Sequence, residues 1–240
     1  MTAPRTDVGA ALGARTSPQA AAPMTVLLPL GSCEQHGPHL PLDTDLRIAV
    51  AIAERVAARA AATPAPHRVV VAPALAYGAS GEHQGFPGTL SIGTDALVTV
   101  VVELLRSAGP EVRHLVAVNG HGGNAEALAR AATIARRERR PFTVWSPRLP
   151  PGGDLHAGHT ETSVLLAIAP GVVCLDRAER GNTGPIAALG DRLRRGGVAA
   201  VSPNGVLGDP VGASDRAGRA ILESWCTELE QHLSQLRTDE

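Results

Sequence analysis

The chain has 240 residues and a formal net charge of −1, with 22 Lys and Arg against 23 Asp and Glu, so it offers no electrostatic basis for binding nucleic acid or an anionic membrane. Every basic side chain is Arg or His because lysine is absent, which excludes Schiff-base chemistry and the lysine of a P-loop phosphate site. The three cysteines are widely spaced and indicate neither a disulfide framework nor a cysteine zinc site, so a reducing cytoplasm is expected.

Strand-like apolar runs alternate with amphipathic helical runs, which predicts an α/β fold with a mainly parallel sheet. Residues 1–23 are expected to be a flexible or short-helical arm and not a secretion signal. Residues 24–240 are expected to form one domain, without an apolar run of membrane-spanning length. In chain order we expect a strand at 24–30, a helix at 46–62, a strand at 68–75, a helix at 95–108 capped by Thr94, a strand at 114–119, a helix at 125–138, a strand at 142–146, and helices at 161–168 and 217–236.

Polar side chains follow three of these strands, at the point where each strand ends. Glu34 and His36 follow the first strand, His83 follows the second, and His121 follows the third. Ligands of open α/β sheets bind beyond the carboxyl ends of the strands. These residues are therefore expected to meet in one active site.

The first polar cluster has the composition of a metal site. Glu34 and His36 are two residues apart, so in an extended segment both side chains point to the same side, whereas Cys33 faces the other side and is interpreted as a packing residue. Asp45 begins the next helix and can return to the same point. Mixed nitrogen and oxygen ligands suit zinc, manganese or iron(II).

The second cluster, Asn119-Gly120-His121-Gly122-Gly123-Asn124, lies in a turn between a strand and a helix. It is compatible with a simple glycine turn or with an anion cradle at a helix N-terminus. A phosphate site would usually add a basic partner, and none lies nearby in the sequence. A metal-ligating His121 fits this turn better.

The third cluster runs from His156 to Ser163 and opens a helix. An acid in a first turn often serves the helix dipole alone, and a single loop histidine usually contacts water or backbone. Here Glu161 follows two histidines and precedes an apolar helix, which favours a ligand and a proton shuttle. Other mechanisms lack their motifs, since the chain has no G-x-S-x-G, no H-E-x-x-H and no G-x-G-x-x-G after the first strand.

Four motifs together resemble the creatininase (creatinine amidohydrolase) family, over residues 24–225. They are Glu34 to Asp45, Glu82-His83 with Phe86 to Thr89, Asn119-Gly120-His121, and His156 to Ser163. The resemblance implies a three-layer α/β/α domain with a mainly parallel central sheet, two divalent metal ions per subunit (Zn, Fe(II) or Mn) and a homo-oligomer.

By this resemblance, five residues hold the two ions: Glu34, His36, Asp45, His121 and Glu161. Glu34 and His36 would bind different ions, and Asp45 would bridge them. Creatininase itself has Asn-Gly-His-Tyr-Glu-Asn in the second motif, with the glutamate as a ligand of the second ion, whereas this chain has Gly123 at that position. The difference argues against creatinine as the substrate and makes Glu161 the candidate for the missing ligand.

Within the family, the chain looks most like the branch of the mycofactocin system, whose members remove a C-terminal dipeptide from a modified precursor peptide. The supporting segments are 78–83 and 202–210. The predicted reaction is amide hydrolysis by a metal-activated water, with His156 as the proton shuttle. The residues expected to bind the peptide substrate are His83, Glu82, Ser80 and Gly122, and His39 is expected to orient a ligand.

Two alternatives remain open. The first is hydrolysis of a small formamide or cyclic amide, as in other branches of the family. The second belongs to another class: a non-catalytic maturation partner that has kept the fold.

Overall fold

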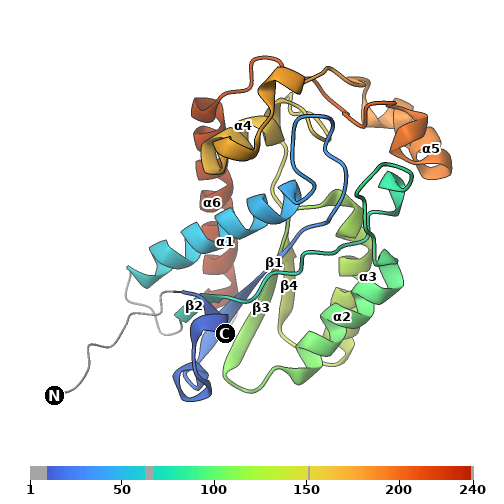
Figure 1. Ribbon diagram of the computed structural model, residues 1–240. Helices are drawn as coiled ribbons and strands as arrows, with labels where there is room; N and C mark the ends of the chain where they lie inside the picture. Colours follow the sequence, from blue (N-terminus) through green and yellow to red (C-terminus); the bar gives the residue numbers. More distant parts are fainter. Residues whose placement is uncertain (1–9, 63–67, 151, 239–240) are drawn as a thin grey trace.

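The computed structural model describes residues 10–62, 68–150 and 152–238, so the first nine residues of the expected arm lie outside the described part. Its centre is a parallel sheet with the strand order β2-β1-β3-β4 (Figure 1). The strands are β1 (Met24–Leu30), β2 (Arg68–Val71), β3 (Val112–Asn119) and β4 (Phe142–Trp145). The mainly parallel sheet predicted from the sequence is confirmed.

Helices cover both faces of the sheet. The helices of the described ranges are α1 (Thr44–Ala61), α2 (Gly93–Ser107), α3 (Ala125–Arg137), α4 (His159–Ile168), α5 (Ile186–Gly196) and α6 (Asp215–Thr238). Helix α5 lies apart from the sheet and packs in a small separate cluster with Val198, Val201 and Leu207. Helices α1, α4 and α6 pack on one face, and α2 and α3 pack on the other (Figure 1). This arrangement confirms the expected three-layer α/β/α fold.

The alternation of side chains along β1 produces these two cores. Leu27 points into the core under α1 and α6, whereas Val26, Leu28 and Leu30 point into the core under α2 and α3. Because both faces of the strand are buried, its sequence is a continuous apolar run. The predicted bounds of this strand, 24–30, agree with the structure.

Several predicted boundaries were wrong: the helices expected from 46, 161 and 217 and the strand expected from 114 each begin two residues earlier. The second strand ends at Val71 and not at residue 75, because Pro73 has no N–H for the ladder, and pairing resumes only as an isolated bridge at Leu75. The helix predicted at 95–108 begins at Gly93, so Thr94 lies inside its first turn and does not cap it. Helix α5 was not predicted at all, since its short sequence contains Gly190 and Gly196, and glycine is a poor helix former.

The segment before β1 lies against the edge of the sheet. It contains two 3-10 helices, η1 (Leu12–Ala14) and η2 (Ser17–Ala20). The N–H of Val71 donates a hydrogen bond of 2.8 Å to the carbonyl of Ala10, so this segment adds backbone pairing to strand β2.

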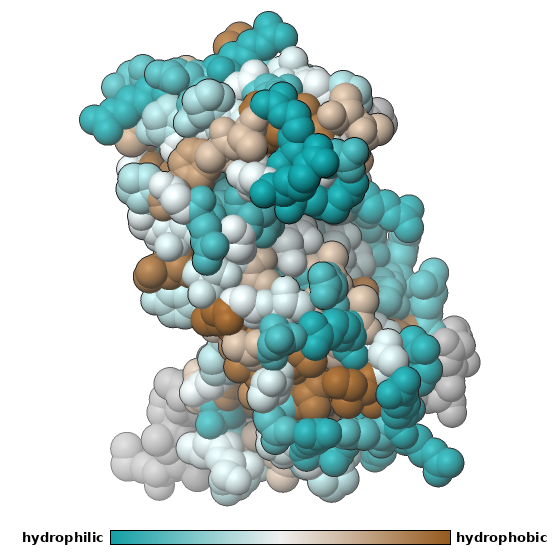
Figure 2. Space-filling model, turned by 90° about the vertical axis from the view of Figure 1, so that its right-hand side faces the viewer, coloured by the Kyte–Doolittle hydropathy of each residue, from teal (hydrophilic) through white to brown (hydrophobic). Residues whose placement is uncertain are grey.

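The surface on the side of α2 and α3 is mostly hydrophilic, with apolar side chains in its lower half (Figure 2). The exposed apolar residues at or near α2 include Leu90, Ile92, Val100 and Leu104. None of the helices in the described ranges is long and apolar enough to cross a membrane.

Candidate metal centre

The polar clusters predicted from the sequence lie beyond the carboxyl ends of β1 and β3. The chain leaves β1 and runs toward the end of the molecule that carries α4 and α5 (Figure 1). This segment supplies Glu34 and His36, and the first turn of α1 supplies Asp45. His121 follows β3, and Glu161 lies in the first turn of α4. Elements far apart in the sequence thus contribute to one buried cluster.

Two groups of potential ligands share one carboxylate. Glu34, Asp45 and His121 form the first group, and His36, Asp45 and Glu161 form the second. Within each group, one ligand atom from each residue lies within 4.8 Å of the others. Asp45 Oδ2 lies 3.4 Å from His121 Nδ1, whereas Asp45 Oδ1 lies 3.0 Å from His36 Nε2. The two oxygens of Asp45 therefore face different groups.

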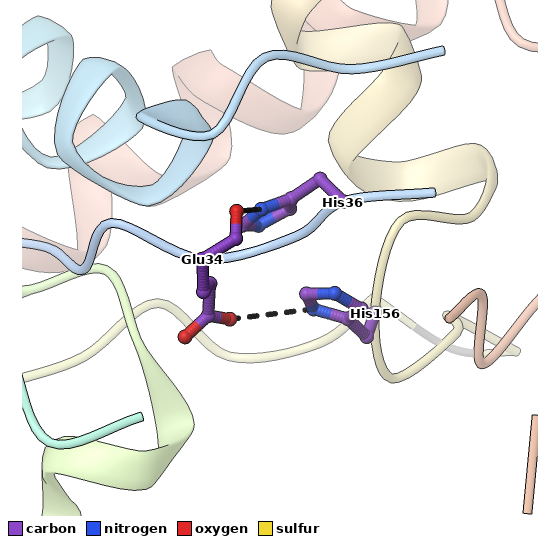
Figure 3. Close-up of side chains that lie close together, drawn as sticks. All are labelled: Glu34, His36 and His156. Carbon is purple, nitrogen blue, oxygen red and sulfur yellow. Dashed lines mark hydrogen bonds and ion pairs between the residues drawn. The ribbon is translucent and has the colours of Figure 1, made fainter. Parts of the chain in front are cut away.

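A third group adds His156 to Glu34 and His36 (Figure 3). Nδ1 of His156 lies 3.8 Å from Oε1 of Glu34, and the rings of His36 and His156 are tilted against each other with centroids 4.3 Å apart. Nδ1 of His36 lies 3.1 Å from the backbone carbonyl of Glu34, which accepts its hydrogen bond. Because Nδ1 is used in this way, Nε2 of His36 is left facing Asp45.

The donor set fits a divalent cation. Both carboxylate oxygens of Glu34, Oδ2 of Asp45 and Nε2 of His121 are buried without a hydrogen-bond partner in the described part of the chain. Burying a polar group without a hydrogen-bond partner is strongly unfavourable. Several such atoms in one buried cluster therefore indicate that a cation binds there. Carboxylate oxygens with imidazole nitrogens suit zinc, manganese or iron(II).

The carboxyl groups are perturbed in the way expected of a buried anionic site. Burial and the neighbouring charge of Asp45 raise the pKa of Glu34 to about 8. Burial raises the pKa of Glu161 to about 7. The pKa of Asp45 is instead lowered, because the charge and the hydrogen bond of His36 outweigh the opposing effect of burial. A bound cation would favour the ionised form of all three.

The histidines of the two groups hold their protons strongly without a cation. Burial opposes the charged form of His36, but the charge and hydrogen bond of Asp45, together with the charges of Glu161 and Glu34, outweigh it and raise its pKa to about 10. Burial likewise opposes protonation of His121, but the carboxylates of Glu82 and Glu34 raise its pKa to about 9. A cation would have to displace these protons, so metal binding at this centre is coupled to proton release.

His83 and His156 are neutral by contrast. Burial lowers the pKa of His83 to about 4. Burial and then the charge of His36 lower the pKa of His156 well below its usual value. Nε2 of His83 lies 3.3 Å from Oε1 of Glu34, so both neutral rings face the same carboxylate oxygen.

The residues predicted to bind substrate surround the first group. Oε1 of Glu82 lies 3.3 Å from Nε2 of His121, and about a third of its side chain is exposed. Ser80 is fully buried, and its hydroxyl has no hydrogen-bond partner in the described ranges. Gly122 is exposed beside His121. Glu82 and Gly122 are thus the members of this set that reach the surface.

The ring of His39 contacts helix α4. Its Nε2 lies 2.9 Å from the hydroxyl of Thr162, in the first half of α4. Its own backbone carbonyl accepts a hydrogen bond from the N–H of Cys174. The described contacts include no hydrogen bond from His39 to a proposed ligand; its ring ties the loop to α4 at Thr162, the neighbour of Glu161.

Two positioning side chains were missed by sequence reasoning. Gln35 lies between the ligands Glu34 and His36, and its amide contacts His83 and His156. Asp154 accepts hydrogen bonds from the backbone N–H groups of His159 and Thr160 and so caps the start of α4. An acid before a helix start was a usable signal for Asp154. Nothing local in the sequence reveals the partners of Gln35.

Comparison with known proteins identifies close relatives. The creatininase profile, described as creatinine amidohydrolase, matches residues 14–233. The mycofactocin precursor peptide peptidase of Mycolicibacterium smegmatis is 56% identical over 213 residues, which are 88% of this chain and 85% of the relative. That of Mycobacterium tuberculosis is 54% identical over 222 residues, covering 91% and 88%. The creatinine amidohydrolase of Pseudomonas putida is 33% identical over 187 residues, covering 66% and 69%.

Solved structures show the same similarity in three dimensions. A mutant creatininase of the Zn-Zn type superposes with a TM-score of 0.79 at 27% identity, covering 95% of this chain and 98% of the other. A creatininase structure with Mn has a TM-score of 0.76 at 27% identity, with the same coverage. Nearly all of the fold is therefore shared with a creatininase of the Zn-Zn type and a creatininase with Mn.

Proposed function

The chain belongs to the creatininase family, and from that membership and the buried carboxylate–histidine centre we propose that it is a metal-dependent hydrolase of a peptide bond. Its proposed substrate is a modified precursor peptide, from which it removes a C-terminal dipeptide. The identity of 54–56% to precursor peptide peptidases over most of the chain supports this choice. The position of Asp45 between two ligand groups is the observation that carries the metal-dependent chemistry.

Five residues are proposed to hold two divalent ions. Glu34, Asp45 and His121 would hold one, and His36, Asp45 and Glu161 would hold the other. When bound, such a pair of ions supplies an activated water and polarises the scissile carbonyl. Glu161 would supply the carboxylate ligand of the second ion, which Gly123 cannot supply because it has no side chain.

The remaining residues are proposed to handle protons and substrate. His156 is neutral because burial lowers its pKa, so it is available to accept a proton and deliver it to the leaving nitrogen. Its Nδ1 faces the centre at 3.8 Å from Glu34. Glu82 and Gly122 lie at the accessible edge, where a peptide enters, with His83 and Ser80 behind them.

We further propose that the chain forms a homo-oligomer. Support comes from the apolar side chains exposed near α2, among which Leu90 is 58% exposed and Leu104 is 38% exposed. Burial of such a patch between subunits would remove apolar surface from water. Light scattering coupled to size-exclusion chromatography tests this proposal, and a monomer at micromolar concentration would refute it.

The hydrolase proposal is tested with a synthetic precursor peptide and mass spectrometry of the products. The metal-loaded protein is expected to release a C-terminal dipeptide, and Asp45→Asn is expected to abolish both bound metal and cleavage. Asp43→Asn is the matched control, because the side chain of this nearby carboxylate is 42% exposed and pairs only with Arg47 among the described contacts. An intact peptide with the loaded wild-type protein would refute the peptidase function. Hydrolysis of a formamide by the same sample would favour the small-amide alternative.

A further inference from the structure

The side-chain amide of Gln35 is buried among polar groups of the centre. Its Oε1 lies 2.8 Å from the backbone N–H of Gly37. Its Nε2 lies 3.0 Å from the backbone carbonyl of Gly205, 2.9 Å from Nδ1 of His83 and 3.0 Å from Nε2 of His156. One amide thus contacts two backbone groups and two histidine rings. The two backbone groups determine which ring nitrogens carry a hydrogen.

The orientation of this amide is determined by the backbone. A backbone N–H only donates and a backbone carbonyl only accepts, so the atom at Gly37 is the amide oxygen and the atom at Gly205 is the amide nitrogen. A flipped amide would place donor against donor and acceptor against acceptor. One of the two amide hydrogens is therefore committed to Gly205, and a single hydrogen is left for the two rings.

That remaining hydrogen goes to His83. Nε2 of His156 also lies 2.8 Å from the backbone carbonyl of Gln35, and a carbonyl needs a donor, so this ring nitrogen carries a hydrogen. A protonated nitrogen cannot accept from the amide. Nδ1 of His83 is then the acceptor for the second amide hydrogen. Each donor and acceptor around Gln35 has one consistent role.

These assignments give the two neutral rings opposite roles toward the same atom. In His83 the hydrogen must be on Nε2, which lies 3.3 Å from Oε1 of Glu34 and faces it. In His156 the hydrogen is on Nε2, so the lone pair of Nδ1 faces the centre, 3.8 Å from the same oxygen.

We infer that Gln35 is a positioning residue: its side-chain amide fixes the tautomer of His83 and its backbone carbonyl fixes that of His156, so that the N–H of one ring and the lone pair of the other face the same oxygen of Glu34. The tautomer assignment stands on the contacts alone, whereas its catalytic consequence rests on the proposed hydrolase function. The consequence is that Nδ1 of His156 is free to take a proton from the attacking water and then to give it to the leaving nitrogen.

Position 205 must be a glycine to leave room for the side-chain amide of Gln35. Its φ of +80° lies in the left-handed region, which favours glycine. A Cβ at this position would overlap the side-chain amide of Gln35. The segment that carries Gly205 therefore closes over Gln35 only when residue 205 has no side chain.

Neutron diffraction of the perdeuterated, zinc-loaded protein tests the assignment without any turnover. The expected map has deuterons on Nε2 of His83 and Nε2 of His156, none on either Nδ1, and the amide nitrogen of Gln35 toward Gly205. A deuteron on Nδ1 of His83 would overturn the proposal. Because this measurement needs no substrate, it remains decisive even if the peptide is not cleaved.

Variant kinetics test the catalytic consequence. Gln35→Glu replaces the amide donor with a carboxylate, so Nδ1 of His83 must then carry a hydrogen, and Gln35→Met removes the donor at similar size. Both are expected to lower kcat about 10–100-fold with KM little changed and two ions still bound. Gln84→Glu adds the same charge at an exposed neighbour of His83 and is expected to keep wild-type kinetics. Unchanged kcat in a folded, metal-loaded Gln35→Glu or Gln35→Met protein would refute the positioning role.

Discussion

The carboxylate of Glu82 fills the space into which a side chain of residue 123 would project. A Cβ on Gly123 would overlap Oε1 of Glu82 and Nε2 of His121, and it would lie 2.6 Å from the backbone carbonyl of Ala79. The glutamate could swing away, but the backbone carbonyl and the buried ring of His121 have little room to move. The contact between Glu82 and His121 therefore leaves no room for a side chain at position 123.

Gly123→Ala is therefore expected to weaken metal binding. The added methyl group must displace His121, and disturbing a ligand or its support typically costs about 10–100-fold in metal affinity. Competition with a chromophoric chelator measures the affinity. Gly122→Ala is the control for metal content, since a Cβ there meets nothing within 4 Å. Wild-type affinity in Gly123→Ala would contradict the proposed contact.

The shared position of Asp45 predicts different stoichiometries for two isosteric variants. Asp45→Asn is expected to lose both ions, because the carboxylate belongs to both ligand groups. Glu161→Gln is expected to keep about one ion per chain, because Glu161 belongs to only one group. Its amide oxygen can still accept the hydrogen bond from the N–H of Ala157, which keeps the start of α4 in place. Metal content by mass spectrometry distinguishes these results, and equal loss in both variants would argue against two separate ions.

The perturbed pKa values predict that the metal-free protein loses stability as pH rises from 7 to 9. Glu34, His36 and His121 have raised pKa values of about 8, 10 and 9, so the folded state binds protons that the unfolded chain has already released. Stability therefore falls with pH in this window. The lowered pKa values of His83 and His156 act only below their unfolded value and do not oppose this trend.

Differential scanning fluorimetry with and without a chelator checks this pH dependence. The Tm of the chelated protein is expected to fall between pH 7 and 9, whereas the loaded protein changes less, because bound cations already hold the ligands deprotonated. By linkage, metal affinity must rise over the same window, and calorimetry in buffers of different ionisation enthalpy should detect proton release on binding. A chelated Tm that rises with pH would contradict the pKa assignments.

Much of the fold was predictable because it depends on local patterns. The run of apolar residues at 24–30 could be buried on both faces of a sheet, and its bounds were predicted correctly. The start of α2 was not, because the chain enters this helix through the left-handed Gly93, with φ of +76°, a backbone conformation that only a glycine adopts readily. Helix boundaries depend on the backbone conformation of single residues, which the apolar periodicity of the sequence does not reveal.

The same distinction applies to the centre. Glu34, His36 and Asp45 lie close together in the sequence, and the structure brings them together, since a short loop and the first turn of α1 leave little freedom. Gln35 could not be interpreted, because its amide is oriented by Gly205, 170 positions away. Long-range contacts of this kind follow from the tertiary fold, and no motif or regular spacing in the sequence signals them.

The cap of α4 gives a last prediction, which links stability to the centre. Asp154 accepts hydrogen bonds from the N–H groups of His159 and Thr160, and Glu161 is the next residue of that helix. Asp154→Ala is expected to destabilise the metal-free protein by about 0.5–2 kcal/mol, because two backbone N–H groups at the helix start lose their acceptor. Asp154→Asn keeps a side-chain oxygen there and is expected to lose less.

Urea unfolding of both variants measures this effect, and metal titration of the folded proteins measures its consequence. Because Glu161 lies in the capped turn, Asp154→Ala is expected to weaken one of the two ions more than the other. Asp209→Ala is a suitable control, since this acid lines the same surface pocket of about 340 Å³ but bonds only Val211 and Arg180 among the described contacts. If Asp154→Ala were destabilised with both affinities unchanged, the cap would serve folding alone, and Glu161 would be positioned by its bond to Ala157.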